Sequence, residues 1–161
     1  DVNLYREAVN SPYFMGLMEA KKLIGLSYNI AARGVGNKEM IRVLKRGISL
    51  SEKFELYDEW ICFLNLKFLL NASLFPDNDP VVIMNEMKEL QQKKNSLNEA
   101  QYFVYKLIRS VQDKSTLQSH IMTELEEAIE LLELQNKKSF SWNVYYNLSL
   151  LKLQLFHHIY F

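Results

Sequence analysis

Residues 24–54 read IGLSYNIAARGVGNKEMIRVLKRGISLSEKF, and this stretch sets the architecture that we expect for the whole chain. Apolar residues recur before Gly34 at the three- and four-residue spacing of a helix, and glycine readily takes the left-handed conformation that ends one. Asn37 then begins a second run with the same spacing. Two short amphipathic helices cannot bury their apolar faces alone, so the stretch predicts a helix pair that needs neighbours.

The same spacing recurs along the chain and predicts about seven helices. Their expected bounds are about 13–33, from 37, 55–74, 80–94, from 96, 115–136 and from 139 to the end, with residues 1–10 as the tail of an earlier helix. Ser11, Asp79 and Ser96 stand where N-caps are expected, and Glu99 completes a capping box with Ser96. The helix at 55–74 is apolar nearly all round, so we expect neighbours on more than one side of it.

Successive helices should form antiparallel pairs that recur at roughly forty residues, a period typical of solenoids. The predicted fold class is all-α, with the pairs stacked as a right-handed solenoid. Basic pairs, Lys93–Lys94 and Lys137–Lys138, stand where the second helices should end and complement the helix dipole there. The chain begins without methionine and ends inside a helix-like run, so we interpret residues 1–161 as a single segment of a longer array.

Composition argues against several classes of protein. Lys+Arg and Asp+Glu number 19 each, so the chain lacks the basic excess typical of a nucleic-acid-binding protein. The apolar run 144–161 is interrupted by polar residues, so we expect no membrane span. The single cysteine, Cys62, stands among large apolar residues, which favours an inert core thiol in a reducing compartment.

No residue pattern predicts catalysis, a metal or a cofactor. Gly34, Val35 and Gly36 do not continue into a dinucleotide or Walker pattern, so the phosphate-loop interpretation is weak. His157 and His158 are adjacent and point apart on a helix, and His120 stands alone, so we expect no metal site. The glutamates at 126, 130 and 133 line one helix face, as solvated residues do. We therefore expect no enzyme and no cofactor.

Aromatic residues suggest a binding surface instead. Most of them fall on helix stripes, where packing is the default, but some are expected to line a groove built by the first helices of successive pairs. The residues that we predict for this protein-partner groove are Asn29, Tyr102, Tyr105, Arg109, Trp142 and Tyr146.

Two motifs connect the chain with tetratricopeptide repeats. Residues 24–28, IGLSY, resemble the LGxxY element of the first repeat helix, and MIRVLKRGISL resembles the AIxxYxxAL segment of the second. The resemblance implies a tetratricopeptide-like array with structural positions at Gly25, Tyr28, Gly34 and Gly47. Gly25 and Gly47 would then mark places where helices approach closely.

Residues 19–103 carry a more specific resemblance. EAKKLIGLSY, then VLKRGISLSEKFELYDEWICFLNLKFLLNASLF and NDPVVIMNEM, follow the order seen in the small helical-repeat subunit of the cohesin loader complex. The resemblance implies a nuclear scaffold that encloses an extended N-terminal segment of the large NIPBL-type loader and supports sister-chromatid cohesion. Its contact with cohesin and chromatin would be indirect, without direct nucleic-acid or membrane binding.

A second resemblance leads to a different class of protein. The sensor domains of bacterial peptide-responsive transcription regulators are also divergent tetratricopeptide-like arrays. This alternative implies a cytoplasmic protein with a small peptide ligand and a helix-turn-helix upstream. The residues that precede Asp1 would distinguish the two.

Overall fold

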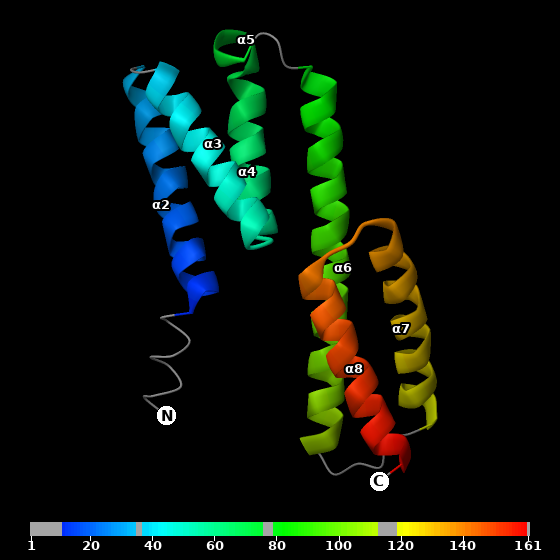
Figure 1. Cartoon of the computed structure of the whole chain (residues 1–161). Helices are drawn as coiled ribbons and strands as arrows, with labels where there is room; N and C mark the ends of the chain where they lie inside the picture. Colours follow the sequence, from blue (N-terminus) through cyan, green and yellow to red (C-terminus); the bar gives the residue numbers. More distant parts are fainter. Residues whose placement is uncertain (1–10, 35–36, 76–78, 113–118, 161) are drawn as a thin grey trace. The chain divides into compact units, whose positions relative to one another are not determined.

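The computed structural model describes residues 11–34, 37–75, 79–112 and 119–160, and within these ranges it contains helices and no strand (Figure 1). The helices are α2 (Pro12–Arg33), α3 (Asn37–Lys53), α4 (Tyr57–Leu69), α5 (Asn71–Leu74), α6 (Pro80–Gln112), α7 (Ser119–Lys138) and α8 (Trp142–Tyr160). The all-α prediction is confirmed. The chain packs as two compact units, residues 1–91 and 92–161. The helix tail predicted in residues 1–10 lies outside the described residues, as do Val35 and Gly36 of the turn.

The ends of α2 follow the predicted capping. The Ser11 hydroxyl accepts a hydrogen bond from the Phe14 amide at 3.2 Å, and Pro12 occupies the first turn. Gly34 closes the helix at a φ of 63°, and its amide donates to the Ala31 carbonyl. The predicted cap at Gly34 is confirmed, because only glycine adopts this left-handed conformation without a Cβ penalty.

The first unit is built on α2, α3 and α4, which run in alternating directions (Figure 1). α4 packs against both α2 and α3, as its apolar circumference predicted. The helix predicted at 55–74 is interrupted at Leu70, where α4 ends and the short α5 begins. The buried core residues are Ala20, Leu23, Ile30, Met40, Val43, Leu44, Leu56, Phe63 and Leu66.

Two glycines of this unit lie directly against the rings of phenylalanine residues. A Cβ on Gly47 would lie 2.3 Å from Phe63 Cζ, and one on Gly16 would lie 2.5 Å from Phe54 Cδ2. The close approach predicted at Gly47 is therefore confirmed, and its neighbour is the ring of Phe63 on α4. The prediction for Gly25 is wrong, because nothing lies within 4 Å of the position that its Cβ would take.

The buried face of α2 does not include Tyr28, one of the structural positions that the tetratricopeptide resemblance implies. It consists of Gly16, Ala20, Leu23, Ser27 and Ile30, while Tyr28 is 55% exposed. Ser27 can be buried because its hydroxyl donates to the Leu23 carbonyl at 2.9 Å. Tyr28 therefore lies outside the core of this unit.

The largest correction concerns α6. The sequence predicts two helices, at 80–94 and from 96, but one helix runs from Pro80 to Gln112. Ser96 is not an N-cap: its single hydroxyl proton lies between two acceptors, the Gln92 carbonyl at 3.1 Å within the helix and Gln135 Oε1 at 2.6 Å on α7. These bonds satisfy the serine without a helix break, so the capping box with Glu99 does not form. The pair Lys93–Lys94 consequently lies inside a helix, whereas Lys137–Lys138 does end α7.

The start of α6 is predicted correctly. The Asp79 carboxylate accepts the Val81 amide at 2.8 Å, and Pro80 opens the first turn. The predicted turn residues 76–78 lie outside the described part of the chain.

The second unit is a bundle of the C-terminal half of α6 with α7 and α8. α6 and α8 run in the same direction and α7 in the opposite one (Figure 1). Their buried core is aliphatic and consists of Ala100, Leu107, Leu125, Ile129, Leu132, Val144, Leu148 and Leu151. The Lys106 ammonium on α6 also binds the Glu124 carboxylate on α7, with both oxygens at 2.6 Å. Packing of neighbouring helices in both units is consistent with a helical repeat, and the right-handed solenoid stays a prediction.

Candidate functional site: an aromatic groove between α7 and α8

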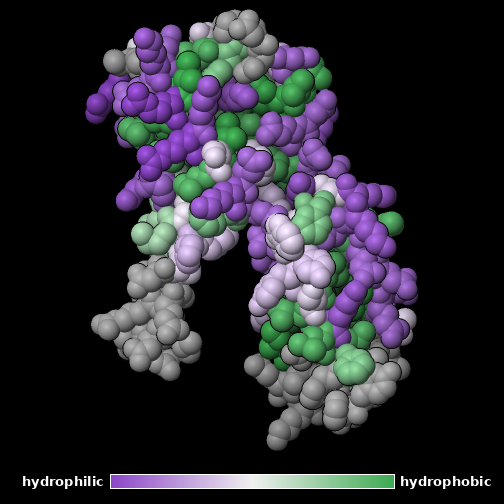
Figure 2. Space-filling model, in the orientation of Figure 1, coloured by the Kyte–Doolittle hydropathy of each residue, from purple (hydrophilic) through white to green (hydrophobic). Residues whose placement is uncertain are grey.

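Helix α8 has apolar residues on two faces. One face is buried in the bundle through Val144, Leu148 and Leu151. The opposite face leaves large apolar side chains exposed, namely Trp142, Tyr145, Tyr146, Leu153 and Phe156. Monomeric surfaces seldom expose a contiguous apolar row of this kind, and larger exposed patches mark interaction sites. In Figure 2, pale and green atoms gather over α8, beside the purple atoms that cover α7.

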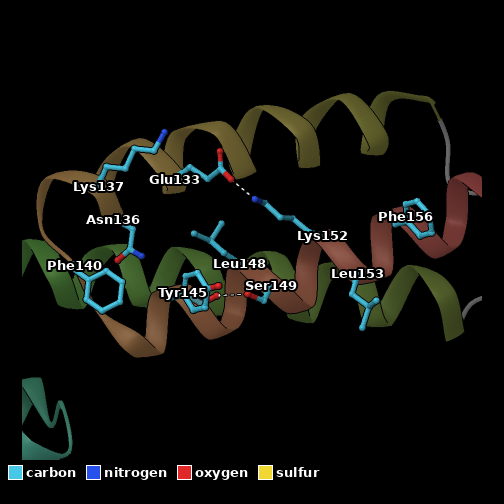
Figure 3. Close-up of a pocket in the computed structure, with 10 residues that line it drawn as sticks. All are labelled: Glu133, Asn136, Lys137, Phe140, Tyr145, Leu148, Ser149, Lys152, Leu153 and Phe156. Carbon is cyan, nitrogen blue, oxygen red and sulfur yellow. Dashed lines mark hydrogen bonds and ion pairs between the residues drawn. The ribbon is translucent and has the colours of Figure 1, made fainter.

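The exposed face of α8 borders a groove with a volume of about 690 Å³ (Figure 3). Its lining comes from α7, the connecting turn and α8, and consists of Glu133, Asn136, Lys137, Phe140, Tyr145, Leu148, Ser149, Lys152, Leu153 and Phe156. The size lies within the 300–1,000 Å³ range of typical ligand clefts. Smaller cavities elsewhere measure about 410 Å³ beside Phe75 and about 320 Å³ beside Ser96.

The turn between α7 and α8 holds one end of the groove in place. The Asn136 carboxamide oxygen accepts the buried Ser141 amide at 2.8 Å, and the Ser141 hydroxyl accepts the Val144 amide at 3.2 Å. Ser141 therefore caps α8, and Asn136 ties the last turn of α7 to that cap. These short-range hydrogen bonds connect the two helices that form the groove.

Three aromatic rings cluster at this end. Phe140 and Trp142 meet edge to face with centroids 4.9 Å apart, and Trp142 meets Tyr145 in the same way at 6.1 Å. Such pairs hold each other in place with about 0.5–1.5 kcal/mol beyond their burial. The cluster is ordered by these contacts and yet each ring is at least half exposed. The exposed surfaces of these rings are therefore available for contact with a partner protein.

An ion pair connects the two helices along the groove. The Lys152 ammonium on α8 donates to the Glu133 carboxylate on α7 (Figure 3). This hydrogen bond, with a smaller contribution from the charge of Lys137, lowers the pKa of the Glu133 carboxyl below its ordinary value. The pair connects α7 and α8 and adds no net charge, so Lys137 gives the lining one excess positive charge.

The six residues predicted for the partner groove fall into three places. Tyr102, Tyr105 and Arg109 are exposed on one face of α6, and Trp142 and Tyr146 are exposed on α8. Asn29 lies on α2 in the first unit, where its side chain donates to the Gly25 carbonyl at 3.0 Å. None of the six lines the groove between α7 and α8, although Trp142 contacts two of its lining residues, Phe140 and Tyr145.

The lining residues themselves were not predicted from the sequence. One signal was present: α8 carries apolar residues at too many positions for a single buried stripe, and its second stripe includes Tyr145, Leu153 and Phe156. The pairing of Glu133 with Lys152 depends on how α7 and α8 pack, which no local pattern encodes.

Cys62 lies apart from this groove, in the first unit. Its side chain is half-buried, and the Tyr28 hydroxyl lies 3.9 Å from its sulfur. This contact raises the pKa of the Tyr28 hydroxyl above its ordinary value. The predicted core thiol is therefore only partly enclosed.

Among the described residues, no group of three or more His, Cys, Asp or Glu side chains is arranged to hold a metal ion. The side chains of His120, His157 and His158 lie outside the described part. No described helix combines the length and apolarity needed to cross a membrane.

Comparison with known proteins gives no assignment. No protein-family model matches the chain, and searches of curated proteins and of solved structures find no match.

Proposed function

We propose that the chain is a protein-interaction module that binds a segment of a partner protein in the groove between α7 and α8. One observation carries the proposal: the exposed face of α8 is apolar and aromatic along a groove of about 690 Å³. Aromatic side chains in preformed clefts contribute a large share of binding energy at protein interfaces. The turn at Asn136 and the ring cluster at Phe140 form one end of the groove.

The polar groups of the site also suit binding. The ion pair of Glu133 with Lys152 lies at the rim, where charges steer association and fix register more than they add affinity. The walls supply apolar contact through Tyr145, Leu153 and Phe156. This combination of an apolar floor and a charged rim is typical of protein interfaces.

The sequence resemblance supplies one specific partner. If the chain is the small subunit of a cohesin loader, it acts in the nucleus, and its partner is the N-terminal segment of the large NIPBL-type loader. We propose this segment as the first natural ligand to test. The resemblance spans residues 19–103, so it does not include the groove, and the general proposal stands independently of it.

The general proposal is tested by selecting peptides from a display library on the full chain and measuring the affinity of those selected. Leu153 is 63% exposed in the groove, and Leu134 is 52% exposed on α7 outside it. Leu153→Asp should weaken binding at least tenfold, about 1.4 kcal/mol, while the matched control Leu134→Asp should leave it unchanged. Circular dichroism checks that both variants keep the helical fold. If no peptide is selected, or if both variants bind equally, the proposed function is wrong.

A further inference from the structure

The groove offers an incoming peptide no backbone edge to pair with. Both walls are α-helices, whose amide and carbonyl groups are bonded within each helix. The described polar lining side chains that already have hydrogen-bond partners are Glu133, Asn136, Ser149 and Lys152. An extended peptide would bring a row of unpaired backbone groups into an apolar cleft, and leaving them unpaired is costly. The groove therefore disfavours an extended occupant.

A helical occupant avoids this cost, because its backbone groups bond within the helix. The lining on α8 extends from Tyr145 to Phe156, a rise of about 16 Å for eleven residues at the helical rise per residue. A helix with apolar residues at i, i+4, i+7 and i+11 presents a stripe of the same length. Docking of an amphipathic helix into an apolar groove is an established mode of recognition.

One face of α7 carries charges of opposite sign at its two ends: Glu133 and Lys137 line the groove, and Glu126 and Glu130 continue the same face beyond the lining. Glu126, Glu130, Glu133 and Lys137 stand at intervals of four, three and four residues, so they share one face of α7. Glu133 is neutralised by Lys152. The remaining charges are negative towards the start of α7, at Glu126 and Glu130, and positive at its end, at Lys137. A partner of complementary charge would carry a carboxylate opposite Lys137 and a cation opposite the two glutamates.

We infer that the occupant of the groove is an amphipathic α-helix from a partner protein, with an apolar stripe facing α8, an acidic residue beside Lys137 and a basic residue beside Glu126 and Glu130. This inference deepens the proposed function and rests on it. It differs from the extended segment that the sequence resemblance implies. The shape of the groove and the charge order along α7 carry it independently of any relative.

The test uses the peptides selected on the full chain, from a library with one half displayed on a helical scaffold and one half unconstrained. Selected sequences should come from the helical half and show apolar residues at i, i+4, i+7 and i+11. A proline placed in the middle of a selected peptide should weaken binding at least tenfold, since it breaks a helix. On Lys137→Glu, the residue selected beside position 137 should change from Asp or Glu to Lys or Arg. Lys138→Glu, at a residue outside the lining, is the control.

The outcomes separate the two proposals. Selected peptides that lose affinity with Leu153→Asp but bind as extended or proline-rich chains keep the proposed function and overturn the helical occupant. If helical peptides are selected with the same flanking charged residues on the wild type and on Lys137→Glu, the proposed pairing of charges with α7 is wrong. Sedimentation of the wild type and of Leu153→Asp measures whether the chain dimerises through this groove. If the wild type is a dimer and Leu153→Asp is a monomer, the occupant is a second copy of the chain, and the inference is wrong. Absence of any groove-dependent peptide overturns the proposed function itself.

Discussion

The two units differ in where the aromatic rings that pack on other groups lie. In the first unit, the ring of Phe63 is fully buried against Gly47, and the side chain of Tyr57 is also buried. In the second unit, the buried core is aliphatic, and the rings of Phe140, Trp142 and Tyr145 lie at the surface. In both units three helices pack around a buried core, and the residue types in the two cores differ.

The difference separates residues that build the fold from residues that are available for contact. A ring inserted against a glycine fixes the distance between two helices, so it cannot be exchanged without repacking. An exposed ring contributes little to folding, since its burial would come only with a partner. We therefore expect mutations of aromatic residues to reduce stability in the first unit and binding in the second.

The largest expected effect is at Phe63. Its side chain is 0% exposed and fills the space above Gly47. Phe63→Ala should lower the free energy of unfolding by about 3–5 kcal/mol, because it removes buried area and leaves a cavity. Chemical denaturation measures the change. Phe156→Ala, at a ring that is 56% exposed, is the matched control and should cost less than about 0.5 kcal/mol. Equal losses for the two variants would remove the contrast between the units.

A smaller loss is expected when the glycine is filled instead. Gly47→Leu should destabilise the chain by about 3 kcal/mol at most, because even a Cβ would lie 2.3 Å from Phe63 Cζ. Gly25→Ala is the control: its position is open, so the better helix propensity of alanine should add up to about 1 kcal/mol. Thermal melting of both variants checks this. An unchanged melting curve for Gly47→Leu would show that the ring does not hold α3 and α4 at this distance.

These two glycines also show how far the sequence could lead. Helical periodicity and capping residues predicted α2 and the start of α6 well, because both signals are local. Gly25 and Gly47 look alike in the sequence, and only the packing of α4 against α3 distinguishes them. Ser96 looks like a cap, but the bond of its hydroxyl to Gln135 on α7 satisfies it inside a helix. Local patterns predict where helices form, and contacts between helices decide where they continue.

The candidate site was harder to predict for the same reason. The exposed tyrosines of α6 and α8 could be recognised as aromatic residues in excess of one stripe. The groove depends on Phe140, which lies in the turn held by Asn136, and on Lys152, which lies further along α8. No spacing rule relates a residue on α7 to one on α8.

Asn136 tests whether the groove is held by its turn. Asn136→Ala leaves the buried Ser141 amide without its acceptor and should lower the free energy of unfolding by about 1–2 kcal/mol. Peptides selected on the groove should also bind several-fold more weakly, because this turn positions the ring of Phe140. Asn143→Ala, at the second residue of α8, is a control for the general loss of an asparagine. Unchanged binding with reduced stability would show that the turn supports the fold alone.

The smallest effect is expected for the ion pair of Glu133 with Lys152, because both side chains are partly exposed to solvent. Lys152 lowers the pKa of the Glu133 carboxyl, so the pair stabilises the fold above the ordinary carboxyl pKa. That contribution is lost as the pH falls through the lowered pKa in the folded chain. Lys152→Met should therefore cost no more than about 1 kcal/mol near neutral pH and nothing in strong acid. Thermal melting of both proteins across this pH range, with NMR titration of the Glu133 carboxyl, measures both effects. A larger loss at neutral pH would make the rim of the groove part of the fold, and the two units would then differ less than their aromatic residues indicate.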